Sequence, residues 1–220
     1  MANREVGAEQ ADSEPSPAAV AFVTTEHFTL QGARSSTIAE ATGRATMFIG
    51  ALSGSLVALG LIATAAGVHT TFYAFALILL PTLAGVGLAT FNRTLQSGVE
   101  DLAYAIRIAR LRGYYFQHAP ELVDHLFSVP PEERLRLQGI GGGRWQKFVT
   151  IAAMVGLVTA VLAGSAAGLL AAIVFNRLLL PALIPALIAG LSIAAVVFAA
   201  LIRFQVSTWK RAAALMLDEE

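Results

Sequence analysis

Four long stretches of the chain are apolar and contain no charged side chain. They cover residues 45–67, 71–91, 148–175 and 178–202. Each is close to the roughly 20 residues that an α-helix needs to cross a hydrocarbon core of about 30 Å. A buried helix of a soluble protein can imitate one such stretch, but four of them in 220 residues are hard to explain in that way. The pattern predicts an all-α integral membrane protein with four transmembrane helices.

Very short links join these stretches in pairs. Residues 68–70 separate the first two stretches, and only Asn176 and Arg177 separate the last two. Helices joined by so few residues are antiparallel neighbours. We therefore expect two transmembrane hairpins, over 45–91 and 148–202, with both tips on the same side of the membrane.

The remaining segments are more polar and predict the aqueous parts of the protein. Residues 1–23 are rich in Ala, Glu, Ser and Pro and predict a disordered N-terminal tail. Residues 24–44 follow a threonine cap and predict a juxtamembrane helix. Residues 92–147 predict a helical segment between the hairpins, and residues 203–220 form the C-terminal tail.

The basic residues are distributed very unevenly between the two sides of this predicted bundle. Fourteen of the 15 lie in residues 1–44, 92–147 or 203–220, and Arg177 alone lies at a hairpin tip. Basic residues concentrate on the cytoplasmic side of membrane proteins. We expect a multi-pass protein of the cell membrane, the inner membrane in bacteria, with residues 92–147 and both termini in the cytoplasm.

Composition narrows the function classes. Only 14% of the residues are charged, against about 25% in a soluble domain. Net charge is zero, which argues against nucleic acid as a partner. Cysteine is absent, which excludes disulfides, thiolate nucleophiles and zinc–thiolate sites. No set of acid, base, nucleophile or metal ligands converges in the pattern, so we expect neither an enzyme nor a cofactor or metal site.

Small residues recur at every fourth position on three of the predicted membrane helices. The residues concerned are Gly50, Gly54, Ala58, Gly156, Ala160, Gly164, Gly168, Ala172 and Gly190. Such stripes let helix backbones approach closely in lipid. We predict that they form helix-packing or homo-oligomer interfaces. Packing within a single four-helix bundle, self-association and a pore lining all remain open.

Residues 92–112 predict a helix that continues the second apolar stretch into the cytoplasm. It carries a heptad-like apolar row, here called the stalk seam: Leu95, Val99, Leu102, Ile106 and Ala109. Gly113 then breaks the pattern. Near its end the helix carries three arginines, for which we predict contact with lipid headgroups or a cytoplasmic protein partner: Arg107, Arg110 and Arg112.

The first half of the chain resembles a known group of proteins. The stretch HFTLQGARSSTIAEATGRATMFIGALSGSLVALG (residues 27–60), the second apolar stretch and the later RIARLRGYYF look like multi-pass membrane proteins common in actinobacteria. The resemblance implies location and topology, and it carries no activity or functional residues. A looser similarity links this half to small bacterial effectors with two membrane helices, found in nucleotide-signalling defence systems.

These patterns favour an oligomeric, non-enzymatic membrane protein. Its most concrete version is a pore-forming or membrane-perturbing effector controlled from the cytoplasm, since short-linked hairpins and glycine stripes adjoin a helical stalk. Two alternatives remain open. One is a transporter or lipid-handling subunit, and the other is a membrane scaffold that binds a partner through residues 92–147.

Overall fold

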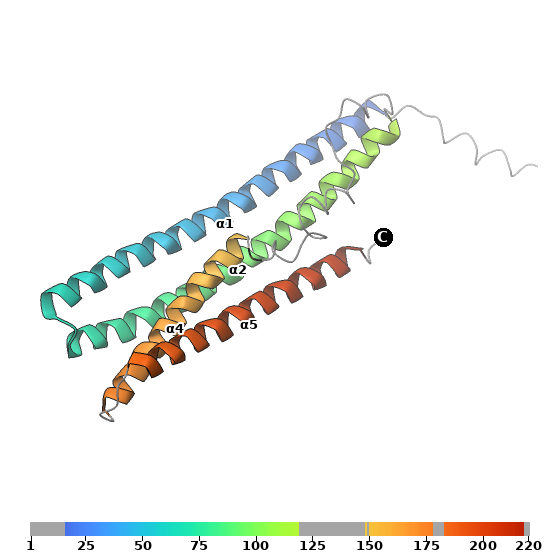
Figure 1. Ribbon diagram of the computed structural model, residues 1–220. Helices are drawn as coiled ribbons and strands as arrows, with labels where there is room; N and C mark the ends of the chain where they lie inside the picture. The colour runs from blue at the N-terminus through green and yellow to red at the C-terminus, as the bar shows by residue number, and fades with distance from the viewer. Residues whose placement is uncertain (1–15, 119–147, 149, 178–182, 218–220) are drawn as a thin grey trace, which may run out of the picture. The chain divides into compact units, whose positions relative to one another are not determined.

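The protein is built from long α-helices. The computed structural model describes residues 16–118, 148, 150–177 and 183–217. Its helices are α1 (Pro17–Ala66), α2 (Thr70–His118), α4 (Ile151–Arg177) and α5 (Leu183–Leu217) (Figure 1). No strand occurs in these described ranges. All four helices are long and apolar enough to cross a membrane, so the prediction of an all-α chain with four helices of this kind is confirmed.

Helix α1 begins earlier than the sequence pattern predicted. The Ser16 hydroxyl accepts a hydrogen bond from the Ala19 amide at 3.2 Å, and Pro17 occupies the first helical position. Serine is a favoured N-cap and proline is well tolerated directly after it. Residues 17–23 are therefore helical, and the prediction of a disordered tail that extends to residue 23 is wrong for this part.

Three residues connect α1 to α2. Gly67 follows the last residue of α1 and has φ of 70°. This left-handed conformation is common just beyond a helix C-terminus and is strained for residues with a Cβ atom. The His69 carbonyl then accepts a hydrogen bond from the Tyr73 amide at 3.1 Å, which opens α2. A glycine at position 67 thus makes the abrupt end of α1 possible.

Two helices extend beyond the lengths expected from the sequence. Helix α2 continues through Gly113 to His118, although Gly113 was predicted to break it. A glycine inside a helix costs about 1 kcal/mol relative to alanine, which packing by its neighbours can offset. Tyr114 and Tyr115 are both half-buried. Helix α5 likewise continues to Leu217, so most of the predicted C-terminal tail is helical.

The chain forms two compact units. Unit 1 comprises Met1–Ser36 and Asp101–Gly142, of which the structure describes residues 16–36 and 101–118. Unit 2 comprises Thr37–Glu100 and Gly143–Glu220, and includes α4 and α5. Residues 119–147 of the predicted cytoplasmic segment 92–147 lie outside the described residues.

The core of unit 2 brings together all four helices. Phe48 of α1, Phe91 and Leu95 of α2, and Val155 of α4 are almost completely buried, and Leu201 of α5 belongs to the same cluster. These residues recur at helical spacing, so each helix presents one apolar face to the others. The buried members of this apolar cluster are aliphatic and phenylalanine side chains.

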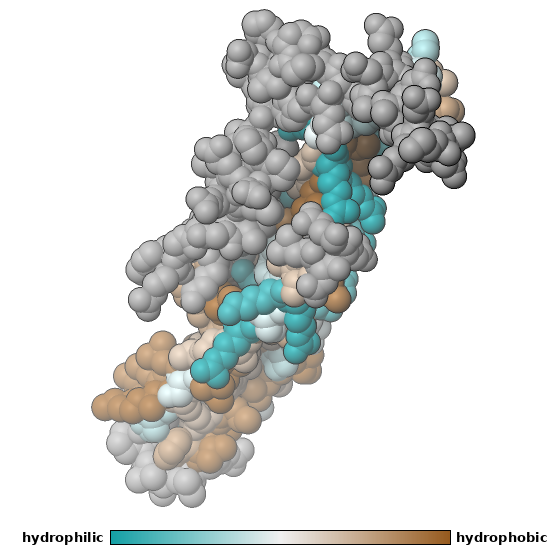
Figure 2. All heavy atoms as spheres, turned by 90° about the vertical axis from the view of Figure 1, so that its right-hand side faces the viewer, coloured by the Kyte–Doolittle hydropathy of each residue, from teal (hydrophilic) through white to brown (hydrophobic). Residues whose placement is uncertain are grey.

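The outer surface of unit 2 is also apolar. Met47, Ile78 and Leu191 each keep 70% or more of their surface exposed. Figure 2 shows brown, apolar side chains at the lower end of the view, where α4 and α5 come together in Figure 1. Exposed apolar surface on this scale is typical of helices whose solvent is lipid.

Helices α4 and α5 touch through glycines. A Cβ atom added at Gly164 would lie 2.5 Å from the Gly190 carbonyl oxygen and 2.7 Å from Ala194 Cβ. One added at Gly168 would lie 3.0 Å from the Ala186 carbonyl oxygen. Only glycine allows these backbones to approach so closely.

Candidate functional site

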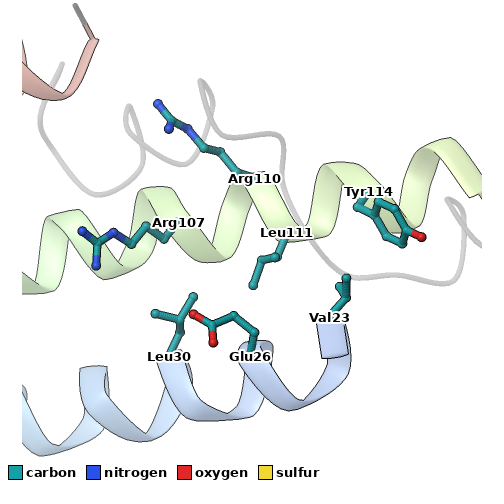
Figure 3. A pocket seen from close by; sticks show the side chains of 7 residues that line it. All are labelled: Val23, Glu26, Leu30, Arg107, Arg110, Leu111 and Tyr114. Atoms are coloured by element: carbon teal, nitrogen blue, oxygen red, sulfur yellow. The ribbon is translucent and has the colours of Figure 1, made fainter. Parts of the chain in front are cut away.

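A groove opens in unit 1 between α1 and α2, and it is called the unit 1 groove below. Its volume is about 360 Å³. It is lined by Val23, Glu26 and Leu30 of α1 and by Arg107, Arg110, Leu111 and Tyr114 of α2 (Figure 3). On α1 these residues follow one another at intervals of three and four, so they share one helix face, and on α2 they span two helical turns.

The groove has an apolar floor and a charged edge. Leu30 is buried, and Val23 and Leu111 are half-buried. In Figure 3, Leu30 and Leu111 point into the space between the two helices, and Arg110 extends from α2 on the side away from α1. The edges differ in charge, because α2 contributes two guanidinium groups and α1 contributes one carboxylate. The groove is therefore suited to an apolar surface flanked by charges of opposite sign.

His27 lies on α1 of unit 1, next to the lining residue Glu26. Its ring meets those of Phe28 and Tyr115 edge-on, with centroids 6.2 and 6.3 Å apart. Its Nδ1 atom is buried and has no hydrogen-bond partner among the described residues. Burial, and to a smaller extent the positive charge of Arg112, lowers the pKa of His27. The neutral imidazole is thus the form that unit 1 favours.

An ion pair links the two helices of unit 1. Arg34 Nε donates to Asp101 Oδ1 at 2.6 Å, and Arg34 Nη2 donates to Asp101 Oδ2 at 3.3 Å. The side chains keep 18% and 27% of their surface exposed. A partly buried, two-pronged pair of this kind holds the relative register of two helices better than an exposed single contact.

A second charged network lies in unit 2. Glu40 accepts hydrogen bonds from Arg44 at 2.9 Å and from Arg93 at 3.1 Å. These two bonds, Arg93 first, lower the pKa of Glu40, and the bond to Glu40 raises the pKa of Arg93. Both groups remain ionised at neutral pH. The network ties α1 to α2 near the predicted ends of their apolar stretches.

The predicted small-residue stripes fall into two groups in the structure. Gly156, Gly164, Gly168 and Gly190 each lie against a neighbouring helix, and Ala160 is buried. Ala58 and Ala172 are half-buried. Gly50 and Gly54, in contrast, are exposed, and an added Cβ atom would meet nothing within 4 Å. The structure thus brings the stripes of α4 and α5 together and leaves the α1 glycines open.

One close contact was missed by the sequence reasoning. A Cβ atom added at Gly87 would overlap the Thr159 hydroxyl and lie 2.8 Å from Phe48 Cζ, so α1, α2 and α4 meet at this glycine. At Gly85, two residues earlier, an added Cβ atom would meet nothing within 4 Å. Helical spacing from the buried Leu83 points to Gly87 as the inward-facing position.

As a group, the residues of the stalk seam are more deeply buried than the three arginines near the end of α2. Leu95, Leu102 and Ala109 are buried, while Val99 and Ile106 are half-buried. Ala105 and Ile108 are buried as well, so the buried row of α2 departs from the predicted one. Of the three arginines, Arg107 and Arg110 are exposed and line the groove, and Arg112 is half-buried.

The chain matches none of the protein-family models, curated proteins or solved structures with which it was compared. Within the described residues, no group of three or more His, Cys, Asp or Glu side chains could hold a metal ion. The unit 1 groove, the glycine contacts and the four apolar helices are therefore the features from which a function is argued.

Proposed function

We propose that this chain is a membrane-anchored docking protein without catalytic activity. Its four apolar helices would form two transmembrane hairpins, with both termini and unit 1 in the cytoplasm. Its groove would hold a cytoplasmic protein at the membrane surface. The likeness to multi-pass membrane proteins of actinobacteria agrees with this location, and the scaffold alternative agrees with this role.

One observation carries the proposal. The groove and the Arg34–Asp101 pair both belong to unit 1, and the residues that form them lie outside the four uncharged stretches. Helices α1 and α2 have 50 and 49 residues, while about 20 suffice to cross a bilayer. The extra length of both helices forms unit 1 and its charged, grooved surface, which suits binding in water.

The absence of cysteine makes the topology directly testable, because single cysteines can be introduced into the natural chain. Thr25 on α1 and His69 in the α1–α2 connection are both exposed. We expect a membrane-impermeant maleimide to label His69→Cys in intact cells and Thr25→Cys only after the membrane is opened. Labelling of both cysteines from the same side would overturn the proposed arrangement.

A pore or other homo-oligomer is the second candidate function. It is favoured by the exposed glycines Gly50 and Gly54 of α1, which are four residues apart and have open space above them. A second copy of α1 could approach this surface closely, as α4 and α5 approach each other at Gly164. Assembly through α1 would also place several spans around one axis.

This candidate predicts a sharp difference between two glycine substitutions. Gly54→Leu would block the close approach, while Gly60→Leu adds the same side chain about 120° around the helix, where a Cβ atom also meets nothing within 4 Å. We expect Gly54→Leu alone to reduce the mass of the particle in mild detergent and to abolish any conductance in planar bilayers. Identical particles for both variants and the natural chain, with no conductance, would exclude assembly through α1.

A further inference from the structure

The residues that line the unit 1 groove have the spacing found where one helix packs against two others. Val23 and Leu30 on α1 are seven residues apart, as are Arg107 and Tyr114 on α2. Seven residues make two helical turns, or about 10 Å. Side chains at this spacing on two adjacent helices form the holes into which the apolar side chains of a third helix insert.

We propose that the groove binds an amphipathic helix of a cytoplasmic protein whose apolar stripe is flanked on one side by acidic residues. This inference rests on the proposed function and adds the class of partner. The apolar stripe would cover Leu30 and Leu111, and the acidic flank would face Arg107 and Arg110 on α2.

The charges of the groove also give the bound helix an orientation. The α2 edge carries two guanidinium groups, and the α1 edge carries the Glu26 carboxylate. A helix with acidic residues toward α2 and a basic residue toward α1 gains attraction on both edges. The same helix turned around places like charges together on both edges, which disfavours that orientation.

A helix fits these features better than a small molecule does. Ligand pockets of about 300–1,000 Å³ bury most of the ligand and orient it with a few converging polar groups. The groove is at the lower end of this range, and its Arg107, Arg110 and Glu26 side chains are exposed. An apolar centre with a charged, exposed rim is the usual anatomy of a protein interface and of helix-in-groove binding.

The full chain in lipid nanodiscs can be tested with defined peptides. The probe is a fluorescent amphipathic peptide of about 20 residues, long enough to be helical, with leucines at heptad positions and glutamates along one flank. A matched peptide carries lysines at the glutamate positions. We expect anisotropy to report saturable binding of the glutamate peptide, and at least tenfold weaker binding of the lysine peptide.

Two substitutions in the groove test the two parts of the recognition. Leu111→Asp should abolish binding, since it places a charge on the apolar floor. The double change Arg107→Glu and Arg110→Glu should weaken the glutamate peptide by about tenfold or more and strengthen the lysine peptide. Arg211→Glu, on exposed α5 surface in unit 2, is the matched charge control and should change neither. Circular dichroism checks that each variant keeps its helices.

Several outcomes would overturn the inference. These are no binding of the glutamate peptide, binding that Leu111→Asp leaves intact, or binding that ignores the charge reversal. Saturable binding of dodecanoate in the groove without peptide binding would assign it to a small amphiphile. A particle that loses a protomer on Leu111→Asp would assign it to a second copy of the chain. The cysteine labelling decides the proposed topology independently, so failure of the peptide test alone leaves that proposal standing.

Discussion

Replacing Gly164 by alanine places a methyl group where α4 and α5 meet. The new Cβ atom would lie 2.5 Å from the Gly190 carbonyl oxygen and 2.7 Å from Ala194 Cβ, and neither neighbour is the mobile end of a long side chain. The helices must therefore move apart. Overpacking of this kind costs about 1–3 kcal/mol, while alanine regains up to about 1 kcal/mol of helix propensity over glycine.

A matched glycine separates these two opposing effects. Gly60 is also helical, and a Cβ atom added there meets nothing within 4 Å. Gly60→Ala therefore gains the propensity without the overlap. We expect Gly164→Ala to be less stable than Gly60→Ala by about 1–3 kcal/mol, the full overpacking cost. Gly168→Ala, whose Cβ atom would lie 3.0 Å from the Ala186 carbonyl oxygen, should fall between the two.

The measurement is reversible unfolding of the purified protein in mixed micelles with increasing dodecyl sulfate, followed by circular dichroism. Tryptophan fluorescence in a Trp145→Phe background provides a second readout, because the remaining Trp209 of α5 lies against Gly98 of α2. Equal midpoints for Gly164→Ala and Gly60→Ala would refute the close α4–α5 contact. Greater stability of Gly164→Ala would refute it more strongly.

Three further predictions concern the helix connection and unit 1. Gly67→Ala should destabilise the protein by about 1–2 kcal/mol in the same titration, because φ of 70° is strained for alanine. Gly67→Asn should cost less, and equal stability of Gly67→Ala and the natural chain would contradict the prediction. A double-mutant cycle with Arg34→Gln and Asp101→Asn should give a coupling energy of about 1 kcal/mol, measured by hydrogen exchange of the unit 1 amides. Additive effects of the two substitutions would show that the ion pair contributes nothing to stability. The lowered pKa of His27 means that the unfolded chain binds more protons below the ordinary value of 6.5, so unit 1 is most stable above that pH and loses stability as the pH falls through the lowered value. Hydrogen exchange, corrected for intrinsic rates, should therefore show more frequent opening of unit 1 from pH 7 toward pH 5, and His27→Gln should flatten this dependence; an unchanged slope would exclude His27 as its source.

The membrane-length helices could be predicted because their signal is local. An uncharged run of the right length needs no knowledge of its neighbours. Gly67, the last residue of the first run, has the residue type that commonly ends a helix. The start of α1 was not predicted, because the predicted helix boundaries rested on apolar periodicity. Ser16 and Pro17 carry a capping signal but belong to no apolar pattern.

The glycine contacts could be predicted only in part. Spacing alone gives Gly50 and Gly54 the same pattern as Gly164 and Gly168, yet only the second pair lies against another helix. Which face of a helix turns inward depends on residues far away in the chain. The unit 1 groove illustrates the same limit, since its two walls are separated by more than 70 residues of sequence. Arg107 and Arg110 were recognisable as a cluster, but their apolar neighbours across the groove were not.

The hydroxyl groups within the apolar helices bear on the choice between docking and transport. Ser53, Thr82 and Thr159 each donate a hydrogen bond to the carbonyl four residues earlier in the same helix, at 2.9, 2.7 and 2.8 Å. A hydroxyl engaged in this way satisfies itself inside a low-dielectric span. To line a polar path it would have to give up that bond to a passing ion or solute.

Among the described residues, two buried hydroxyl groups of α2 lack such a bond. Thr94 and Ser97 are buried in α2, and their hydroxyl oxygens have no hydrogen-bond partner within the described part of the chain. They follow Phe91, the last residue of the second apolar stretch, by three and six residues. Buried hydroxyl groups without a partner among the described residues thus occur in α2 just beyond the predicted end of the bilayer. This distribution favours helices that anchor a protein in lipid, with recognition in water, over helices that conduct a solute across it.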